Sequence, residues 1–169
     1  MRKIHYCVAM SLDGYIAGPN GEYDWIIDDP EIDMAADLAR FDTALVGRKT
    51  FDAMVHENRT EVPGLHVIVF SRTLRQSDFP QVTIVAEKQK QTVEALREKP
   101  GKEILVWGAN LFHGLLEDDL VDAVDIGVIP VLLGGGIPLL PAPASCKKLQ
   151  LMEHKIYKSG IVGLQYAVK

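Results

Sequence analysis

The stretch EILVWGANLFHGLL, residues 103–116, decides the fold, because a strand passes into a helix through residues that have almost no side chain. Residues 104–107 are apolar and predict a buried strand. Gly108 and Ala109 form a turn of small residues, and residues 110–116 form an amphipathic run. A strand, a short turn and a helix in this order are typical of an α/β domain with a parallel sheet.

The rest of the chain repeats this alternation. It predicts helices over residues 88–99, over residues 30–40 and from the GRKT turn to about residue 55, and strands at residues 4–10, 43–46, 67–70, 82–85 and 123–129. Pro30 suits the first position of its helix, with Asp29 as the N-cap. Residues 162–168 alternate between apolar and other side chains after the turn 158–160. We therefore expect a mostly parallel sheet that ends in an antiparallel hairpin.

Length and composition fit a single domain over residues 1–169, since 47% of the residues are apolar, 24% are charged and no linker divides them. The net charge of −5 disfavours nucleic-acid binding, which needs a basic face. No apolar run reaches the roughly 18 residues of a membrane span. Cys7 and Cys146 fit reduced thiols in a cytoplasmic protein. The histidines lack metal-ligand spacing, and neither a P-loop nor a serine-hydrolase motif occurs.

Three predicted strands end in turns of small, hydroxyl or basic residues: TALVGRKT (43–50), VIVFSRT (67–73) and EILVWGAN (103–110). In open α/β sheets, ligands collect at the carboxyl ends of the strands. Helix N-termini there offer free N–H groups and a partial positive charge of about half a unit, and arginine adds a forked donor for phosphate. One such turn is an ordinary connection, whereas three in one domain predict a ligand with several phosphates.

The chain resembles the dihydrofolate reductase-like superfamily, and within it the reductase domains of the bifunctional riboflavin-biosynthesis deaminase-reductases and their stand-alone relatives. The resemblance implies a three-layer αβα fold with about eight strands. It also implies an NADPH-dependent pyrimidine reductase of riboflavin biosynthesis, or a reductase of a related small heterocycle. The matching motifs follow the family's order over nearly the whole length: SLDGYIAG (11–18), DWI (24–26), LVGRKTF (45–51), IVFSRTL (68–74), VWGANLF (106–112) and VLLGGGIPLLP (131–141).

The same resemblance implies which residues hold NADPH. The cofactor phosphates would be surrounded by Gly47, Arg48, Lys49 and Thr50, and the 2′-phosphate would meet Ser71 and Arg72. The pyrophosphate would be held by Gly108, Ala109 and Asn110, and the nicotinamide would meet Ala9 and Ile16.

On the substrate side, the resemblance implies that Trp25 closes over the reacting end. Counting back from GRKT places Glu31 where folate reductases carry a carboxylic acid, although acidic residues in a first helical turn are also ordinary complements of the helix dipole. The expected substrate contacts are Tyr23, Asp24, Gly134 and Gly135. The glycine run has an alternative interpretation as a bend between strands.

The sequence departs from the family pattern in two places. Trp107-Gly108 stands where dihydrofolate reductases carry a Gly-Gly pair that is often joined by a cis peptide. A non-proline cis bond costs roughly 3 kcal/mol, so one retained here would signal function, while packing in the core is the alternative role for Trp107. The riboflavin-pathway reductases carry a serine before the tryptophan and an arginine on the first helix, where this chain has Tyr23 and residues such as Asp33 and Met34.

Two functional hypotheses follow. The first is an enzyme that passes a hydride from NADPH to a small-molecule substrate, and the second is a module that binds NADPH or an adenine nucleotide as a sensor or scaffold without turnover. The alternating tail also leaves an apolar edge that predicts a homodimer, paired across a two-fold axis.

Overall fold

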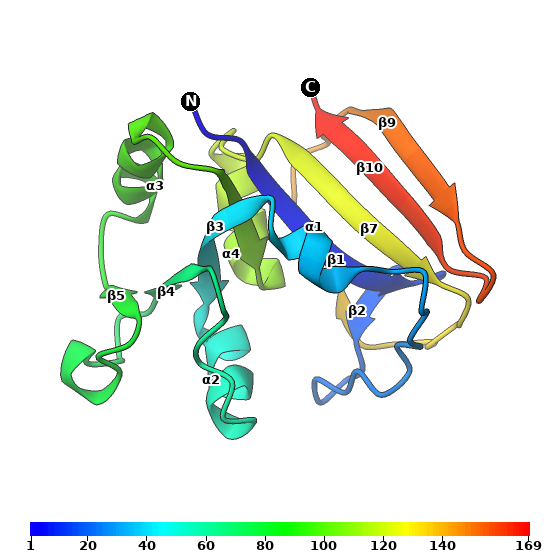
Figure 1. Ribbon diagram of the computed structural model, residues 1–169, viewed down its shortest axis with the longest axis horizontal. Coiled ribbons are helices and arrows are strands. Elements are labelled where there is room, and N and C mark those ends of the chain that lie inside the picture. The colour runs from blue at the N-terminus through cyan, green and yellow to red at the C-terminus, as the bar shows by residue number, and fades with distance from the viewer.

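The computed structural model describes residues 1–169 and contains a mixed sheet of eight strands in the order β5-β4-β3-β6-β1-β7-β10-β9 (Figure 1). The strands are β1 (Ile4–Ser11), β2 (Tyr15–Ala17), β3 (Phe41–Gly47), β4 (His66–Phe70), β5 (Thr83–Val85), β6 (Glu103–Trp107), β7 (Ala123–Ile129), β8 (Ile137–Pro138), β9 (Leu149–Ile156) and β10 (Val162–Val168). The helices are α1 (Met34–Leu38), α2 (Arg48–His56), α3 (Gln89–Glu98) and α4 (Ala109–Glu117), with a 3-10 turn at Gln76–Asp78.

Strand pairing in the main sheet is parallel from β5 to β7 and antiparallel from β7 to β9. In the antiparallel part, Leu164 lies opposite Ile126, and Tyr166 lies opposite Val124. Successive side chains of a strand point to opposite faces, so the apolar residues of the tail share one face of the sheet. The mixed, mostly parallel sheet and the terminal hairpin are therefore confirmed.

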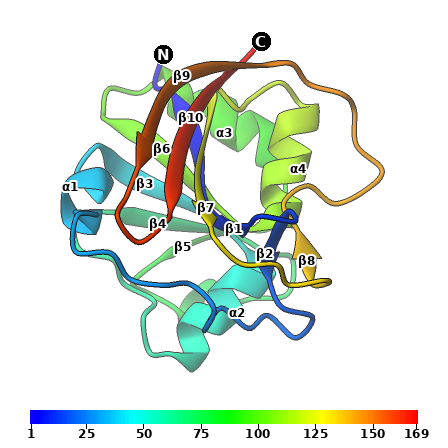
Figure 2. The same cartoon turned by 90° about the vertical axis from the view of Figure 1, so that its right-hand side faces the viewer.

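Helices lie on both faces of the sheet, with α3 and α4 on one side and α1 and α2 on the other (Figure 2). On the first face, Tyr6 of β1 stacks on Phe112 of α4 with 3.9 Å between ring centroids. On the second face, the fully buried Phe51 of α2 meets Phe79 edge-on at 5.1 Å. Each face therefore has its own apolar core, which is the three-layer arrangement.

The first helix is shorter than the sequence predicts. Its N-cap is Asp33, whose carboxylate accepts a backbone N–H of the first turn at 3.0 Å. Asp29 instead accepts the backbone N–H of Ser159 at 3.2 Å, and so fastens its turn to the connection between β9 and β10. Of the helix predicted over residues 30–40, only Met34–Leu38 is confirmed, and the start at Pro30 with Asp29 as the cap is wrong. Asp29 accepts the N–H groups of Glu31 and Ser159 in a turn that precedes the helix.

The segment over residues 11–29 contains the short strand β2, which pairs with β8. The pairing brings the two backbones so close that a Cβ atom on Gly136 would lie 2.1 Å from the carbonyl oxygen of Ala17. Gly136 also has a φ of +146°, which disfavours other residues. The last glycine of the GGG run is therefore a structural requirement of this small sheet.

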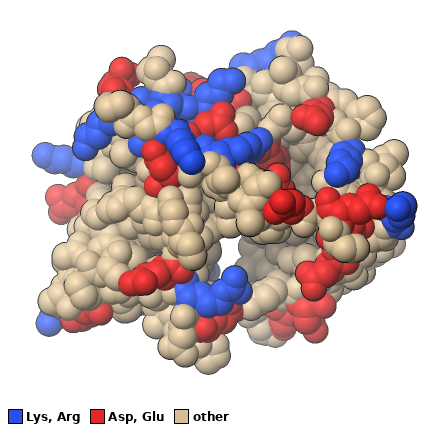
Figure 3. All heavy atoms as spheres, viewed as in Figure 1, with Lys and Arg blue, Asp and Glu red and all other residues tan.

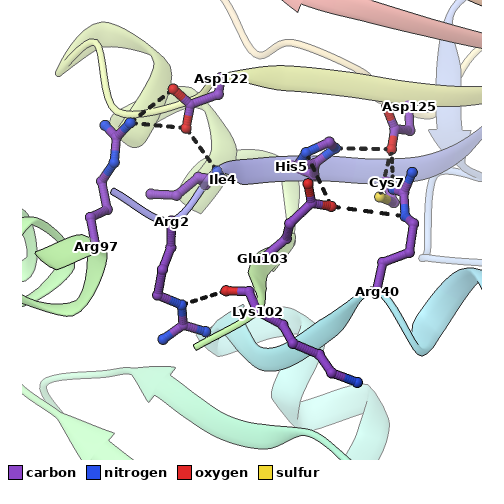
Figure 4. Close-up of polar contacts among 10 residues, drawn as sticks. All are labelled: Arg2, Ile4, His5, Cys7, Arg40, Arg97, Lys102, Glu103, Asp122 and Asp125. Carbon is purple, nitrogen blue, oxygen red and sulfur yellow. Dashed lines mark hydrogen bonds and ion pairs between the residues drawn. The ribbon is translucent and has the colours of Figure 1, made fainter. Parts of the chain in front are cut away.

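Buried charges lie at the opposite edge of the sheet, where the parallel strands begin (Figure 4). Arg2 is 8% exposed, forms an ion pair with Asp42 and donates to the carbonyl oxygen of Lys102 at 2.5 Å. Arg97 donates to both oxygens of Asp122, at 2.8 and 3.0 Å. Because buried charges are tolerated when they are paired, these contacts fix the amino ends of the strands to one another.

The same edge holds a second group of polar side chains around His5 (Figure 4). Asp125 Oδ2 lies 3.1 Å from His5 Nδ1 and accepts a hydrogen bond from Arg40 at 2.7 Å. Burial alone would raise the pKa of Asp125, but the hydrogen bonds from His5 and Arg40 hold that pKa below its usual range. Burial, reinforced by the negative charge of Asp125, raises the pKa of the Cys7 thiol, so this cysteine stays protonated and unreactive.

The turn after β6 has the backbone geometry of a glycine-specific position. Gly108 has a φ of +110°, and a Cβ atom there would lie 2.8 Å from Thr50 Oγ1. The Trp107-Gly108 peptide bond is trans, and the one cis bond joins Ala142 to Pro143. The turn from β6 to α4 thus depends on glycine rather than on a cis peptide.

Replacing Gly108 with alanine should destabilise the fold by about 1–3 kcal/mol, because both the positive φ and the contact with Thr50 oppose a side chain. Thermal unfolding measures this as a fall in Tm of roughly 2–4 °C per kcal/mol. Gly135→Ala is the matched control, since a Cβ atom there meets nothing within 4 Å. Equal Tm values for the two variants would show that Gly108 is not required.

Candidate functional site

The carboxyl ends of β3 and β6 form the centre of the candidate site. The two strands are neighbours, with Leu45 opposite Val106 and Val46 opposite Trp107. The chain leaves β3 into α2 on one face of the sheet, and it leaves β6 into α4 on the other face (Figure 2). Such a divergence of connections opens a crevice at the strand ends, which is the usual ligand site of open α/β sheets.

Two helix N-termini meet at this crevice. Gly47 is the N-cap of α2 and Gly108 is the N-cap of α4, and neither helix start has a side-chain cap. A Cβ atom on Gly108 would lie 3.6 Å from the backbone nitrogen of Gly47, so the two turns are in contact. The first N–H groups of both helices have no partner within their helix and carry partial positive charge. Together they form a site for a negatively charged group.

Basic side chains lie at the start of α2 and in the turn after β4. Arg48 donates to Asp52 at 2.7 and 2.9 Å, and it reaches the end of β4 through Ser71 at 3.4 Å and Thr73. Lys49 and Arg72 are exposed and form no ion pair within the chain. The structure therefore brings together the basic residues of two of the predicted turns and leaves two of them free for an anionic ligand.

The other predicted cofactor residues differ in whether their side chains are exposed and already hydrogen-bonded within the chain. The Ser71 hydroxyl accepts backbone hydrogen bonds from Thr73 at 3.3 Å and Leu74 at 3.2 Å, so it already holds its own turn. Ala109 is buried at the first position of α4, whereas Asn110 is exposed and forms no hydrogen bond through its side chain. Asn110 is thus the side chain of the third turn that is available to a ligand.

The side of the crevice nearest β1 has a floor of small residues. Ala9 of β1 lies opposite Gly127 of β7, and Gly127 lies opposite Gly163 of β10. Partners in register share a face, so Ala9 and Gly127 leave a small flat area. The Tyr157 ring closes this area at Gly163, where a Cβ atom would lie 3.5 Å from Tyr157 Cε2. Ile16 of β2 is half-buried. A planar ring fits such a floor, which suits the nicotinamide contacts expected of Ala9 and Ile16.

Asp13 anchors the glycine loop to the end of β1. Its carboxylate accepts hydrogen bonds from the Ser11 hydroxyl at 2.6 Å and from the backbone N–H groups of Leu133 at 3.0 Å and Gly134 at 2.7 Å. The bond from Ser11, followed by the backbone bonds, lowers the pKa of Asp13 to about 2. Gly134 and Gly135 have open space where a Cβ atom would lie. The sequence analysis did not single out Asp13, although the Ser-x-Asp-Gly turn was a usable signal.

The loop after β2 contacts the C-terminal end of α2. The Tyr23 hydroxyl donates to Glu57, the residue that caps the C-terminus of α2. The Trp25 indole donates to the carbonyl oxygen of Glu22 at 3.0 Å, and Asp24 is exposed. The space-filling view shows a hollow between α2 on one side and β2 with this loop on the other (Figure 3). Tyr23 therefore ties this loop to the end of α2, while the Trp25 indole is held within the loop.

Glu31 lies beside the β9–β10 turn and not in a helix. Its carboxylate forms an ion pair with Lys158 at 2.9 Å, and its backbone N–H donates to Asp29 at 2.8 Å. The turn that carries Lys158 is at the carboxyl edge of the sheet, because β10 begins opposite the end of β7. The sequence reasoning missed Lys158 as a neighbour of Glu31, since the two are joined only through the tertiary fold.

None of the helices reaches the length and apolar character that a membrane crossing requires. The structure also brings together no group of three or more histidine, cysteine, aspartate or glutamate residues that could hold a metal ion.

The architecture is that of the dihydrofolate reductase-like superfamily. The chain belongs to the RibD C-terminal domain family, whose model matches residues 2–163. The uncharacterized protein YyaP of Bacillus subtilis (strain 168) is 34% identical over 178 residues, which cover 98% of this chain and 94% of YyaP.

Two solved structures share the fold over almost the whole chain. A protein assigned to riboflavin biosynthesis from Shewanella sp. PV-4 has 28% identity and a TM-score of 0.85, with 99% of both chains covered. The dihydrofolate reductase of Enterococcus faecalis, solved with NADP(H), has 15% identity and a TM-score of 0.72, covering 99% of this chain and 96% of that enzyme. At such low identity, the second likeness concerns the fold alone.

Replacing Asp13 with asparagine tests whether the carboxylate anchors the glycine loop. A carboxyl group with a lowered pKa contributes stability above its unfolded pKa of roughly 4, and this contribution is lost as the pH falls through the folded value of about 2. Wild type should therefore be more stable than Asp13→Asn at neutral pH, and the difference should shrink between about pH 4 and pH 2. Urea unfolding at several pH values measures it. A difference that does not change with pH would contradict the role of the charge.

Proposed function

We propose that the protein is an NADPH-dependent reductase that transfers a hydride to a conjugated C=N or C=O bond of a small heterocyclic substrate. The single observation that carries this proposal is the meeting of two uncapped helix N-termini at Gly47 and Gly108. Membership of the RibD C-terminal domain family supports an oxidoreductase, and the fold relative from Enterococcus faecalis was solved with NADP(H).

The residues of the crevice fit the phosphates of this cofactor. A Cβ atom at Gly108 would fill the space between the two turns, so the glycine keeps open a cradle in which an anion reaches backbone N–H groups. Lys49 and Arg72 are exposed cations without ion-pair partners, whereas Arg48 is paired with Asp52. Lys49 and Arg72 are therefore suited to bind the cofactor phosphates. We assign the pyrophosphate to the two helix starts and the 2′-phosphate to Arg72.

The chain's own residues would then orient the rings and exclude water. NADPH, when bound, supplies the hydride. The small floor at Ala9 and Gly127 would hold a planar ring flat against the sheet, while Trp25 and its loop cover the hollow from the β2 side. Orientation of two reacting groups in a closed site is the main contribution that a protein makes to hydride transfer.

The proton that accompanies the hydride has two candidate sources in this proposal. Glu31 lies at the correct edge of the sheet, but Lys158 holds its carboxylate in an ion pair. An ordered water in the hollow is the other source, and it needs no acidic residue. Glu31→Gln separates them, because a loss of turnover without a loss of cofactor binding would assign the proton to Glu31.

The substrate class follows from what α1 lacks. The resemblance implies an arginine on the first helix that holds the phosphate of a ribosylaminouracil, whereas α1 reads MAADL and has no basic residue. We therefore propose a heterocycle of the pyrimidine or pterin type as the acceptor, with 5-amino-6-(5-phosphoribosylamino)uracil as one member to be tested. We also propose a cytoplasmic location, where the free Cys7 and Cys146 stay reduced.

Calorimetric titration with NADPH and NADH tests the cofactor assignment. Wild type should prefer NADPH, and Arg72→Ala should weaken NADPH by about tenfold to a hundredfold with little effect on NADH, because one charged hydrogen bond to the 2′-phosphate is lost. Arg75→Ala is the matched control, since Arg75 is also exposed and lies on the same segment. An equal loss for both cofactors would remove Arg72 from the 2′-phosphate. Binding of NADPH without oxidation in the presence of pyrimidine and pterin acceptors would favour a non-catalytic binding module.

A further inference from the structure

An open groove lies between helix α3 and the end of the sheet at which β5 is the last strand. Figure 1 shows α3, β4 and β5 at the same end of the molecule. The groove has a volume of about 640 Å³, a size that accommodates a small ligand. The sheet lines it with Ile68 of β4 and Val85 of β5, and the helix lines it with Ala95 and Leu96. Its middle is therefore apolar on both sides.

The groove stays open because α3 is anchored in the core behind it. The fully buried Val93 of α3 belongs to the same apolar core as Ile68 of β4 and Ile104 of β6. All three residues of β5 are only half-buried. Leu96 and Val85 pack against the edge of the core and stay partly exposed. An apolar molecule in the groove would remove these side chains from water, which is favourable.

The charged side chains that line the groove are lysines at its two ends. Lys88 is the N-cap of α3 and Lys99 is its C-cap, and the lining contains no aspartate or glutamate. Lys90 of the same helix pairs with Asp118 at 3.2 Å, whereas Lys88 and Lys99 form no ion pair. An apolar groove with unpaired cations at its ends is complementary to an anion that has an apolar body.

The two ends differ, and the difference places the anionic group at Lys88. The first turn of α3 has no side-chain cap there, so its free N–H groups add partial positive charge. At the other end, the helix C-terminus carries partial negative charge, and the side chains of His66 and Thr83 are 3.0 Å apart and satisfy each other. From Lys88 to Lys99 the helix rises about 16 Å, close to the length of an extended chain of about twelve carbons.

We propose that this groove binds a medium-chain fatty acid. The carboxylate contacts Lys88 and the N-terminus of α3, and the hydrocarbon chain lies between α3 and β5. The site is separate from the crevice at Gly47 and Gly108. The Ser71 N–H donates to the carbonyl oxygen of Val85 at 3.0 Å, so the head of the groove adjoins the turn that carries Arg72 but does not include it. The proposal does not depend on reductase activity.

Calorimetric titration with acetate, octanoate, decanoate and dodecanoate below their micellar concentrations tests the site. Affinity should rise roughly threefold for each added methylene, because each one is buried in the groove, and acetate should not bind measurably. Lys88→Gln should weaken dodecanoate about tenfold, since one charged hydrogen bond is lost. Ala95→Glu should weaken it at least as much, because it places a negative charge in the wall of the groove at an exposed position that tolerates glutamate in a helix.

Lys90→Gln is the matched control, because it removes the same charge from the same turn of α3 but lies outside the groove lining. Arg72→Ala is a second control for the predicted phosphate site. Both variants should bind dodecanoate like wild type, and circular dichroism shows whether each variant is folded.

Four results would overturn the proposal. Wild type that does not bind dodecanoate would show that the groove has no such ligand, and equal affinity for acetate and dodecanoate would leave an anion site without a groove. Unchanged binding in both Lys88→Gln and Ala95→Glu would place the fatty acid on another apolar surface. A loss of binding in Arg72→Ala would move the carboxylate to the crevice.

Discussion

The structure depends on the contact between two glycine turns at the carboxyl ends of β3 and β6. These neighbouring strands send their helices to opposite faces of the sheet, so the chain has to turn twice in the same small space. A Cβ atom on Gly108 would lie 2.8 Å from Thr50 Oγ1 and 3.6 Å from the backbone of Gly47. Small residues let both turns fit, and their close fit is what brings two helix N-termini together. The proposed anion site is therefore a consequence of packing two connections at the point where the chain passes to opposite faces of the sheet.

Much of this arrangement could be predicted from sequence because it is local. Apolar runs that end in small or basic residues fix a strand, its turn and the start of the next helix within a dozen residues, and β7 begins and ends where the pattern places it. The terminal hairpin follows from alternation alone. The helix predicted over residues 30–40 begins later than expected, at Met34, because the signals for its start, a proline and an acidic residue, are also compatible with a turn. The contact of Asp29 with Ser159 selects the turn, and no local pattern records a partner so far along the chain.

The candidate site divides in the same way. Its proposed phosphate half comes from three strand-end turns, and each of them can be recognised from its own sequence motif. Its proposed substrate half is assembled from the β1–β2 turn, the loop around Glu31, the glycine loop and the β9–β10 turn. Backbone N–H groups that donate to the carboxylates of Asp13 and Asp29 hold these pieces together. Such contacts between segments more than a hundred residues apart decide the shape of the substrate half, so residue types alone do not identify the substrate.

The buried ion pairs of Arg2 and of Asp125 lie at the amino edge, at the other end of the strands from the crevice (Figure 4). Substitutions in the loops proposed to face the substrate would therefore leave these charges paired and the strand starts fixed. Over evolutionary time, a lineage with this layout can exchange one acceptor for another by altering a few loop residues, without first acquiring compensating changes in the sheet. Because the two edges are separate, the sheet would tolerate changes in substrate specificity. The β1–β2 turn, the loop around Glu31, the glycine loop and the β9–β10 turn are therefore the segments to vary in directed evolution.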